Sequence, residues 1–151
     1  MSQVKFENNK IQVEDALKSA IVSYLHEAAG EMMSQAARNT RVDMGQLKGS
    51  WDYKVDNTTA TIGSPLENAI WEEFGTGEYA LHGDGRKGGW YVPESKLSSQ
   101  AKSKMKKVVI DGKVFYFTRG KTPSRAFWKA YTKLKSKLIK RAEQVIGCKM
   151  K

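Results

Sequence analysis

The chain has 151 residues, of which 40% are hydrophobic and 28% charged, and its formal net charge is +10; this length suits one domain with a hydrophobic core of its own. The sequence contains no run of about 20 apolar residues, which a transmembrane helix needs, and its first residues lack the apolar segment of a signal peptide. The single cysteine, Cys148, excludes an intramolecular disulfide and a zinc site made of several thiolates, so we expect a reducing cytosol.

The first predicted element is a long amphipathic helix over residues 11–38, which ends near Asn39 and Thr40. Apolar residues recur there at steps of three or four and therefore share one face of the helix. We expect this face to pack in the core; it comprises Val13, Leu17, Ile21, Tyr24, Ala28, Met32 and Ala36.

A β-hairpin is predicted next. Asp43 is expected to cap a short turn whose Leu47 points inward. Residues 51–55 alternate large apolar and polar side chains, and residues 58–62 are rich in β-branched ones. The intervening Asp56–Asn57 is a turn signal, so the two segments should pair as antiparallel strands.

A short helix and a loop follow the hairpin. The apolar residues at positions 66, 69, 70 and 74 fit one or two helical turns, and Gly75 or Gly77 should end them. Residues 78–89 are rich in glycine and are predicted to form a loop.

Residues 90–92 and 114–118 have the composition of strands and are expected to pair as a second hairpin. Residues 94–112 between them are predicted to be an extended basic loop, whose Ser/Lys-rich part over 96–107 is typical of a mobile segment. Asp111–Gly112 predicts a tight turn near its end.

The last predicted element is a helix that begins at Thr122–Pro123, with threonine as the N-cap and proline in the first turn, and that ends at Gly147. Its apolar stripe is Phe127, Tyr131, Leu134, Leu138, Ala142 and Val145. The chain is therefore predicted to be a single α+β domain over 1–151, with residues 1–10 as a tail. The long N-terminal and C-terminal helices should pack on one face of a small antiparallel sheet.

No catalytic, cofactor or metal site is predicted. Gly83–Gly88 matches the GxGxxG pattern, but a turn precedes it and a strand follows, whereas a dinucleotide site needs a strand before and a helix after. His26 and His82 are the only histidines, which is weak evidence for a metal site. Glu72 and Glu73 are adjacent and point in different directions, so we expect one to be exposed and the other to pair with a basic group.

The positive charge is unevenly distributed along the chain. Residues 1–85 hold 7 Lys/Arg and 13 Asp/Glu, a net charge of −6, whereas residues 86–151 hold 19 and 3, a net charge of +16. Basic residues interleaved with aromatic ones could contact nucleic acid, but the same aromatic spacings also build a core. The residues we single out as possible contacts with DNA or a partner are Lys102, Lys104, Lys106 and Lys107.

Three segments together resemble one bacteriophage family. They are Val42-Asp-Met-Gly-Gln-Leu-Lys-Gly-Ser50, Asn68-Ala-Ile-Trp-Glu-Glu-Phe-Gly-Thr76 and Lys121-Thr-Pro-Ser-Arg-Ala-Phe-Trp-Lys-Ala130. In this order, after a long first helix, they are similar to motifs of the small head–tail connector proteins, also called neck or tail-completion proteins, of long-tailed phages and prophages. The third segment lacks the second proline of the family pattern.

The resemblance implies a structural, non-enzymatic protein without a cofactor. It implies a ring of copies around the DNA channel at the head–tail junction, or at the tail-completion position, and a curved antiparallel sheet under two helices. The implied location is the virion, or the host cytoplasm during assembly, with head-closure and tail proteins as neighbours, DNA close by and no membrane.

The resemblance also marks motif positions for the fold or for an interface. Gly45 and Gly75 would permit tight turns, and Thr76 would cap or hydrogen-bond the loop. Leu47, Trp71, Phe74 and Phe127 would anchor the motifs in the core. The full set is Asp43, Gly45, Leu47, Ser50, Trp71, Glu73, Phe74, Gly75, Thr76, Pro123, Phe127 and Ala130.

The charge asymmetry suggests how such a ring would close. Each contact in a ring joins two different patches of the same protein, so an acidic flank and a basic flank would complement each other. Two other classes of function stay open from the residues alone. One is a small basic nucleic-acid-binding or toxin-like RNA-cleaving protein; the other is an enzyme that uses His82 in a Ser/His/Asp arrangement, whose partners need not be neighbours in the chain.

Overall fold

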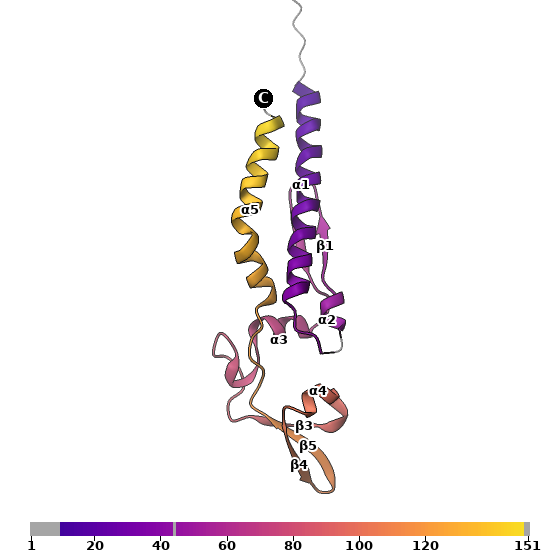
Figure 1. Cartoon of the computed structure of the whole chain (residues 1–151), viewed down its shortest axis with the longest axis vertical. Coiled ribbons are helices and arrows are strands. Elements are labelled where there is room, and N and C mark those ends of the chain that lie inside the picture. The colour runs from indigo at the N-terminus through magenta and orange to yellow at the C-terminus, as the bar shows by residue number, and fades with distance from the viewer. Residues whose placement is uncertain (1–9, 44, 150–151) are drawn as a thin grey trace, which may run out of the picture.

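The computed structural model of the chain describes residues 10–43 and 45–149. The molecule is elongated: a pair of long helices with a β-hairpin occupies one end, and a small sheet occupies the other (Figure 1). The predicted α+β class is confirmed, since long N-terminal and C-terminal helices pack together with small antiparallel sheets. The expectation of one sheet under both helices is wrong, because the strands form two separate sheets.

The core lies between α1 (Lys10–Asn39) and α5 (Ala126–Lys149), which run side by side (Figure 1). Small residues allow the two helices to approach closely, and Ala36 and Ala130 are fully buried there. The core cluster is Met32, Ala36, Ala130 and Leu134, with Trp51, Ile62, Phe127 and Leu138 packed against it. The predicted first helix is confirmed within a residue at each end.

The predicted apolar stripe of α1 is only partly buried. Met32 and Ala36 belong to the core, whereas Val13 is half exposed and the nearby Ile11 is 73% exposed. Figure 1 gives the reason: the first turns of α1 extend beyond the end of α5, so they have no helix to pack against. The predicted tail over residues 1–10 lies outside the described residues except for Lys10, which begins α1.

The first hairpin packs on α1 through one face. Strands β1 (Asp52–Val55) and β2 (Ala60–Gly63) pair antiparallel, with Tyr53 opposite Ile62. Burial alternates along β1, as expected for a hairpin with one covered face. The predicted hairpin is confirmed.

The short turn before the hairpin is the helix α2 (Gln46–Gly49), and its Leu47 is buried as predicted. The predicted capping by Asp43 is wrong. Gly45 stands at the N-cap with a φ of 78°, without a side-chain cap. Asp43 instead accepts a hydrogen bond from the Ser98 hydroxyl, which lies 2.9 Å from each carboxylate oxygen.

The second sheet has the strand order β3–β5–β4 and is antiparallel throughout. Its strands are β3 (Trp90–Pro93), β4 (Lys106–Ile110) and β5 (Lys113–Thr118). The predicted pairing of residues 90–92 with 114–118 is confirmed, and so is the turn at Asp111–Gly112 between β4 and β5.

The prediction of an extended loop over residues 94–112 is wrong. The segment forms a single 3₁₀ turn, η2 (Glu94–Lys96), the short helix α4 (Ser99–Lys102) and then β4. Ser98 caps α4 through a hydrogen bond from the Ala101 N–H. The backbone of residues 106–110 pairs with β5. The lysine-rich composition of this segment does not indicate that a strand forms there.

Both predicted ends of the last helix are wrong. The helix α5 begins at Ala126 rather than Pro123, and Gly147 lies inside it rather than after it. Arg125, just before the helix, has a φ of 53°, and its carbonyl accepts the first helical bond, from the N–H of Lys129. None of the described helices has the length and apolar character needed to cross a membrane.

Candidate functional site

The second sequence motif lies where the helical pair joins the three-stranded sheet. It forms the helix α3 (Asn68–Phe74), which ends at Gly75, and the 3₁₀ turn η1 (Gly77–Tyr79) follows. Gly75 has a φ of 75°, and a Cβ there would lie 2.8 Å from the carbonyl oxygen of Lys121. Only glycine fits this conformation and this close approach. This agrees with the prediction that Gly75 permits a tight turn.

Backbone hydrogen bonds join the end of α3 to the segment that leads into α5. The Thr76 N–H donates to the Lys121 carbonyl at 2.9 Å, and the Lys121 N–H donates to the Thr76 hydroxyl at 3.0 Å. The N–H of Glu78 donates to Arg119, and that of Ser124 donates to Glu72. The Thr76 hydroxyl thus accepts a hydrogen bond from a segment 45 residues away rather than from the loop that follows it.

Glu73 caps α5 from outside that helix. Its two carboxylate oxygens accept the N–H groups of Phe127 and Trp128, each at 2.9 Å. A carboxylate at this position satisfies two free donors and interacts favourably with the positive end of the helix dipole. This replaces the predicted local cap by Thr122, and it gives the motif residue Glu73 a structural function.

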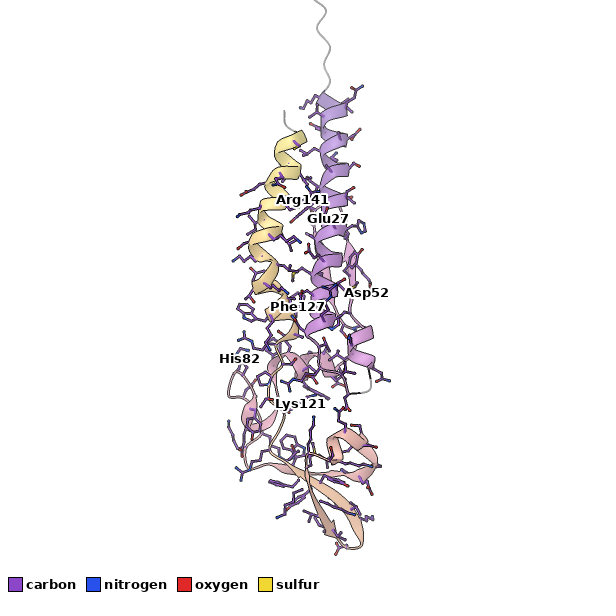
Figure 2. All side chains as sticks on the ribbon, viewed as in Figure 1. Glu27, Asp52, His82, Lys121, Phe127 and Arg141 are labelled. Atoms are coloured by element: carbon purple, nitrogen blue, oxygen red, sulfur yellow. The ribbon has the colours of Figure 1, made fainter. Side chains whose placement is uncertain are left out.

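Glu72 is buried and forms an ion pair with Lys121. Lys121 lies on the crossing segment, which is the stretch of chain between β5 and α5 (Figure 2). The Glu72 Oε2 atom and the Ser124 hydroxyl are buried and have no hydrogen-bond partner among the described residues. The prediction for these two glutamates is half right: Glu72 pairs with a basic group, but Glu73 is half buried rather than exposed.

The inward position of the two glutamates leaves the apolar side chains of α3 facing outward. Ile70, Trp71 and Phe74 are 61%, 49% and 43% exposed. The prediction that Trp71 and Phe74 anchor the motif in the core is therefore wrong, whereas Leu47 is buried and Phe127 packs against the core as predicted.

These side chains continue along the outer side of α5. Trp128 is one of the two residues whose N–H groups Glu73 accepts, and its ring lies 5.8 Å from that of Tyr131. We call the following set of exposed residues on α3 and α5 the apolar strip: Ile70, Trp71, Phe74, Trp128, Tyr131, Ile139 and Ile146. Exposed apolar surface of this extent is typical of protein–protein contacts rather than of a free monomer surface.

Part of the strip lines an open groove between α5 and α1. It is lined mainly by apolar side chains, including Tyr131, Leu138 and Ile139. Tyr24 reaches into it from α1 and donates a hydrogen bond of 2.7 Å to the Leu138 carbonyl. Burial raises the pKa of the Tyr24 phenol above its ordinary value, with Glu27 adding to the effect.

Residues 5–75 match the model of the family described as "Bacteriophage HK97-gp10, putative tail-component". These residues, just under half of the chain, are therefore similar to the HK97-gp10-like family. The predicted resemblance to a phage connector or tail-completion family is thus confirmed, and the match is to a family of phage structural tail components. No curated protein and no solved structure matches the chain.

The part of the chain that matches the HK97-gp10-like family includes α1, the first hairpin and α3. The first motif reaches the second through side chains: the Ser50 hydroxyl bonds that of Ser64 at 2.6 Å, and the same Ser64 oxygen accepts the Leu66 N–H just before α3. The third motif, around Pro123 and Ala130, lies outside the match but meets α3 through Glu73.

His82 is exposed, with its ring 5.6 Å from that of Phe74. Among the described residues, no three His, Cys, Asp or Glu side chains gather as metal ligands would. Trp90 begins a strand directly after the GxGxxG residues, as predicted, so no helix stands there to bind a pyrophosphate.

Charge pairs connect the acidic first half of the chain to the basic second half within one molecule. Figure 2 shows Glu27 and Arg141 facing each other between α1 and α5, 3.4 Å apart. Glu31 pairs with Lys137 in the same way, and Glu78 pairs with Arg119 at the other end. Some of the acidic residues of the first half are therefore paired with basic residues of the second half within the same molecule.

The four lysines predicted as contacts are not equivalent. Lys102 forms an ion pair with Glu94 at 3.6 Å and is partly buried. Lys104, Lys106 and Lys107 are exposed and have no charged partner among the described residues. These three remain available for an external ligand.

Proposed function

We propose that this phage tail component is a subunit of a ring of identical copies at the head–tail junction, or at the tail-completion position, around the DNA channel. Its neighbours there are head-closure and tail proteins. The family match supports a virion structural role, and the apolar strip along α3 and α5 is the observation that supports contact with a neighbouring subunit.

The position of the strip suits a ring. It lies on the α5 side of the molecule, whereas the first hairpin lies on the other side of α1 (Figure 1). A heterologous contact uses two different patches of one protein, and patches on opposite flanks allow the contact to repeat around a closed ring. The strip is apolar, so burial rather than charge pairing would provide most of the affinity.

The experiment adds one charge to the strip. Ile139→Lys places an ammonium group where the neighbour would bury an alkyl side chain, and we expect incorporation into particles to fall at least tenfold. Thr132→Lys, which adds the same charge at an exposed position of α5 outside the strip, is the matched control. Immunoblots of purified particles measure incorporation, after circular dichroism has verified that both variants fold.

Cryo-electron microscopy of particles that carry the unmodified chain tests the location. We expect several copies in a closed ring at the junction or tail-completion position. Density elsewhere in the particle, or a single copy, would contradict the proposal. Equal incorporation of the two lysine variants would show that the strip is not the contact between subunits.

A further inference from the structure

Cationic side chains form a row along one flank of α5. Lys129, Lys133, Lys137 and Arg141 follow one another at steps of four residues, and Lys140 lies seven residues after Lys133. Residues three, four or seven positions apart share one side of a helix, so we call these five residues the cationic row. Like charges four residues apart destabilise a helix, and α5 holds 7 Lys/Arg but 1 Asp/Glu, a net charge of +6. Negative charge that offsets this repulsion has to come from outside α5.

The helix α1 supplies carboxylates to one end of the row. Glu27 pairs with Arg141 at 3.4 Å, and Glu31, four residues further along α1, pairs with Lys137. These two pairs neutralise the C-terminal part of the row within the molecule.

The rest of the row has no carboxylate partner. Four residues after Glu31, α1 carries Gln35, whose neutral amide oxygen accepts a hydrogen bond of 3.2 Å from the Lys133 ammonium group. Lys129 and Lys140 are exposed and have no acidic partner in the part of the chain that the structure describes. The positive charges of these three lysines therefore remain uncompensated.

The row borders an open hollow between α1 and α5. Lysine and arginine side chains line it on the α5 side, with Ser136 among them, and Glu27 and Glu31 line it on the α1 side. A nucleic acid carries negative charge along its whole backbone, so these two carboxylates would repel it. A protein helix can place carboxylates against the free lysines alone. The mixture of charges in the hollow therefore favours a protein partner.

The row is separate from the apolar strip on the same helix. At 3.6 residues per turn, Trp128, Ile139 and Ile146 of the strip lie on one side of α5. The three uncompensated lysines lie about 130° further round the helix axis. The two surfaces can therefore bind different partners at the same time.

A second copy of the chain does not match the row. Among the described helices, Glu27 and Glu31 are the one pair of carboxylates four or seven residues apart, and both are already paired. Glu14 and Asp15 are adjacent and so point to different sides of α1. This favours a different protein over a copy of this chain.

We propose that the cationic row binds a helix of another virion protein, which presents carboxylates at helical steps that match Lys129, Lys133 and Lys140. The three ammonium groups are four and seven residues apart, and charges at such steps select the partner in helix pairs. Pairs of this kind determine orientation and partner choice more than affinity. The inference rests on the proposed place in the virion but not on the ring of copies.

Photo-crosslinking in assembled particles identifies the protein that occupies the row. Ser136 is exposed in the middle of the row and is replaced by the photoreactive residue benzoylphenylalanine. We expect an adduct with a virion protein other than this chain, whose crosslinked peptide carries at least two Asp or Glu at steps of four or seven. The same replacement at Lys87, an exposed position in the loop before β3, is the control and should not give this adduct.

A charge swap tests the pairing itself. Lys129→Glu/Lys140→Glu should lower incorporation into particles at least tenfold, because like charges then face each other. Changing the mapped carboxylates of the partner to lysine should restore incorporation to within about twofold of the unmodified pair, since each ion pair re-forms with its signs exchanged. Lys18→Glu/Lys87→Glu makes the same change in net charge at exposed positions outside the row and should be incorporated normally. Circular dichroism verifies that each variant folds.

Several results would overturn the proposal. They are an adduct of the Ser136 position with another copy of this chain or with DNA, no adduct above that of the Lys87 position, equal incorporation of the two double variants, and a swap that restores nothing. The ring is tested separately by Ile139→Lys. If that variant is incorporated like its control while the adduct and the swap succeed, the ring contact is wrong and the partner of the row stands; the reverse pattern overturns the row alone.

Discussion

At the scale of single residues, the family motif around α3 acts mainly as a junction. Glu72 is paired with Lys121, Glu73 caps α5, Gly75 permits the close approach of the two chain segments, and Thr76 bonds the crossing segment. The aromatic members of the motif face solvent. The same short segment therefore fastens the fold through its polar side chains and exposes its apolar ones for contact.

Glu73→Ala tests the capping role. The change removes both acceptors of the Phe127 and Trp128 N–H groups, and we expect the free energy of unfolding to fall by about 1–2 kcal/mol, the usual effect of losing a helix cap. Urea denaturation measures the change. Glu67→Ala removes an exposed carboxylate just before α3 and should change stability by less than about 0.5 kcal/mol. Equal losses in the two variants would contradict the assignment.

At the scale of elements, the contact between α1 and α5 depends on small residues. Ala36 and Ala130 are fully buried and leave no room for a longer side chain. Ala130→Leu should therefore force the helices apart and lower the free energy of unfolding by about 1–3 kcal/mol. Thr132→Leu, two residues along on the exposed side of α5, introduces the same side chain and should be close to neutral.

Thermal or urea unfolding of both leucine variants measures this difference. A loss in Ala130→Leu no larger than that in Thr132→Leu would mean that the helices do not approach as closely as they do here. Side-chain pairs at the rim, such as Glu27 with Arg141, contribute less, because exposed ion pairs are worth about 0–1 kcal/mol.

At the scale of the whole molecule, the core is unevenly distributed. The buried cluster lies between α1 and α5, whereas Tyr116 is the one hydrophobic residue of the described three-stranded sheet that is buried. Regions with few buried apolar contacts open at lower free energy than the core. We expect amides of β3–β5 to exchange with solvent through partial opening, and those of residues 29–36 and 127–138 only through global unfolding.

Native-state hydrogen exchange followed by mass spectrometry measures these two free energies. The β1–β2 hairpin is the internal comparison: it is also small, but it packs on α1 and should exchange more slowly than the three-stranded sheet. A single free energy for both sheets and the helices would mean that the molecule opens as one unit.

The sequence by itself determined the long helices, the first hairpin, the pairing of residues 90–92 with 114–118, α3 with its glycine stop and the resemblance to the phage family. These depend on local periodicity, turn residues and short motifs, which act within a few neighbouring positions. The tertiary structure decided three features: the hydrogen-bond partner of Asp43, the start of α5 at Ala126, and the exposure of Trp71 and Phe74. In each case a partner distant in the chain, Ser98 for Asp43 and Glu73 for α5, satisfies a group that local rules assign to a neighbour. The split into two sheets and the charge pairs between α1 and α5 have the same origin, because only folding brings residues about 100 positions apart within a few ångströms.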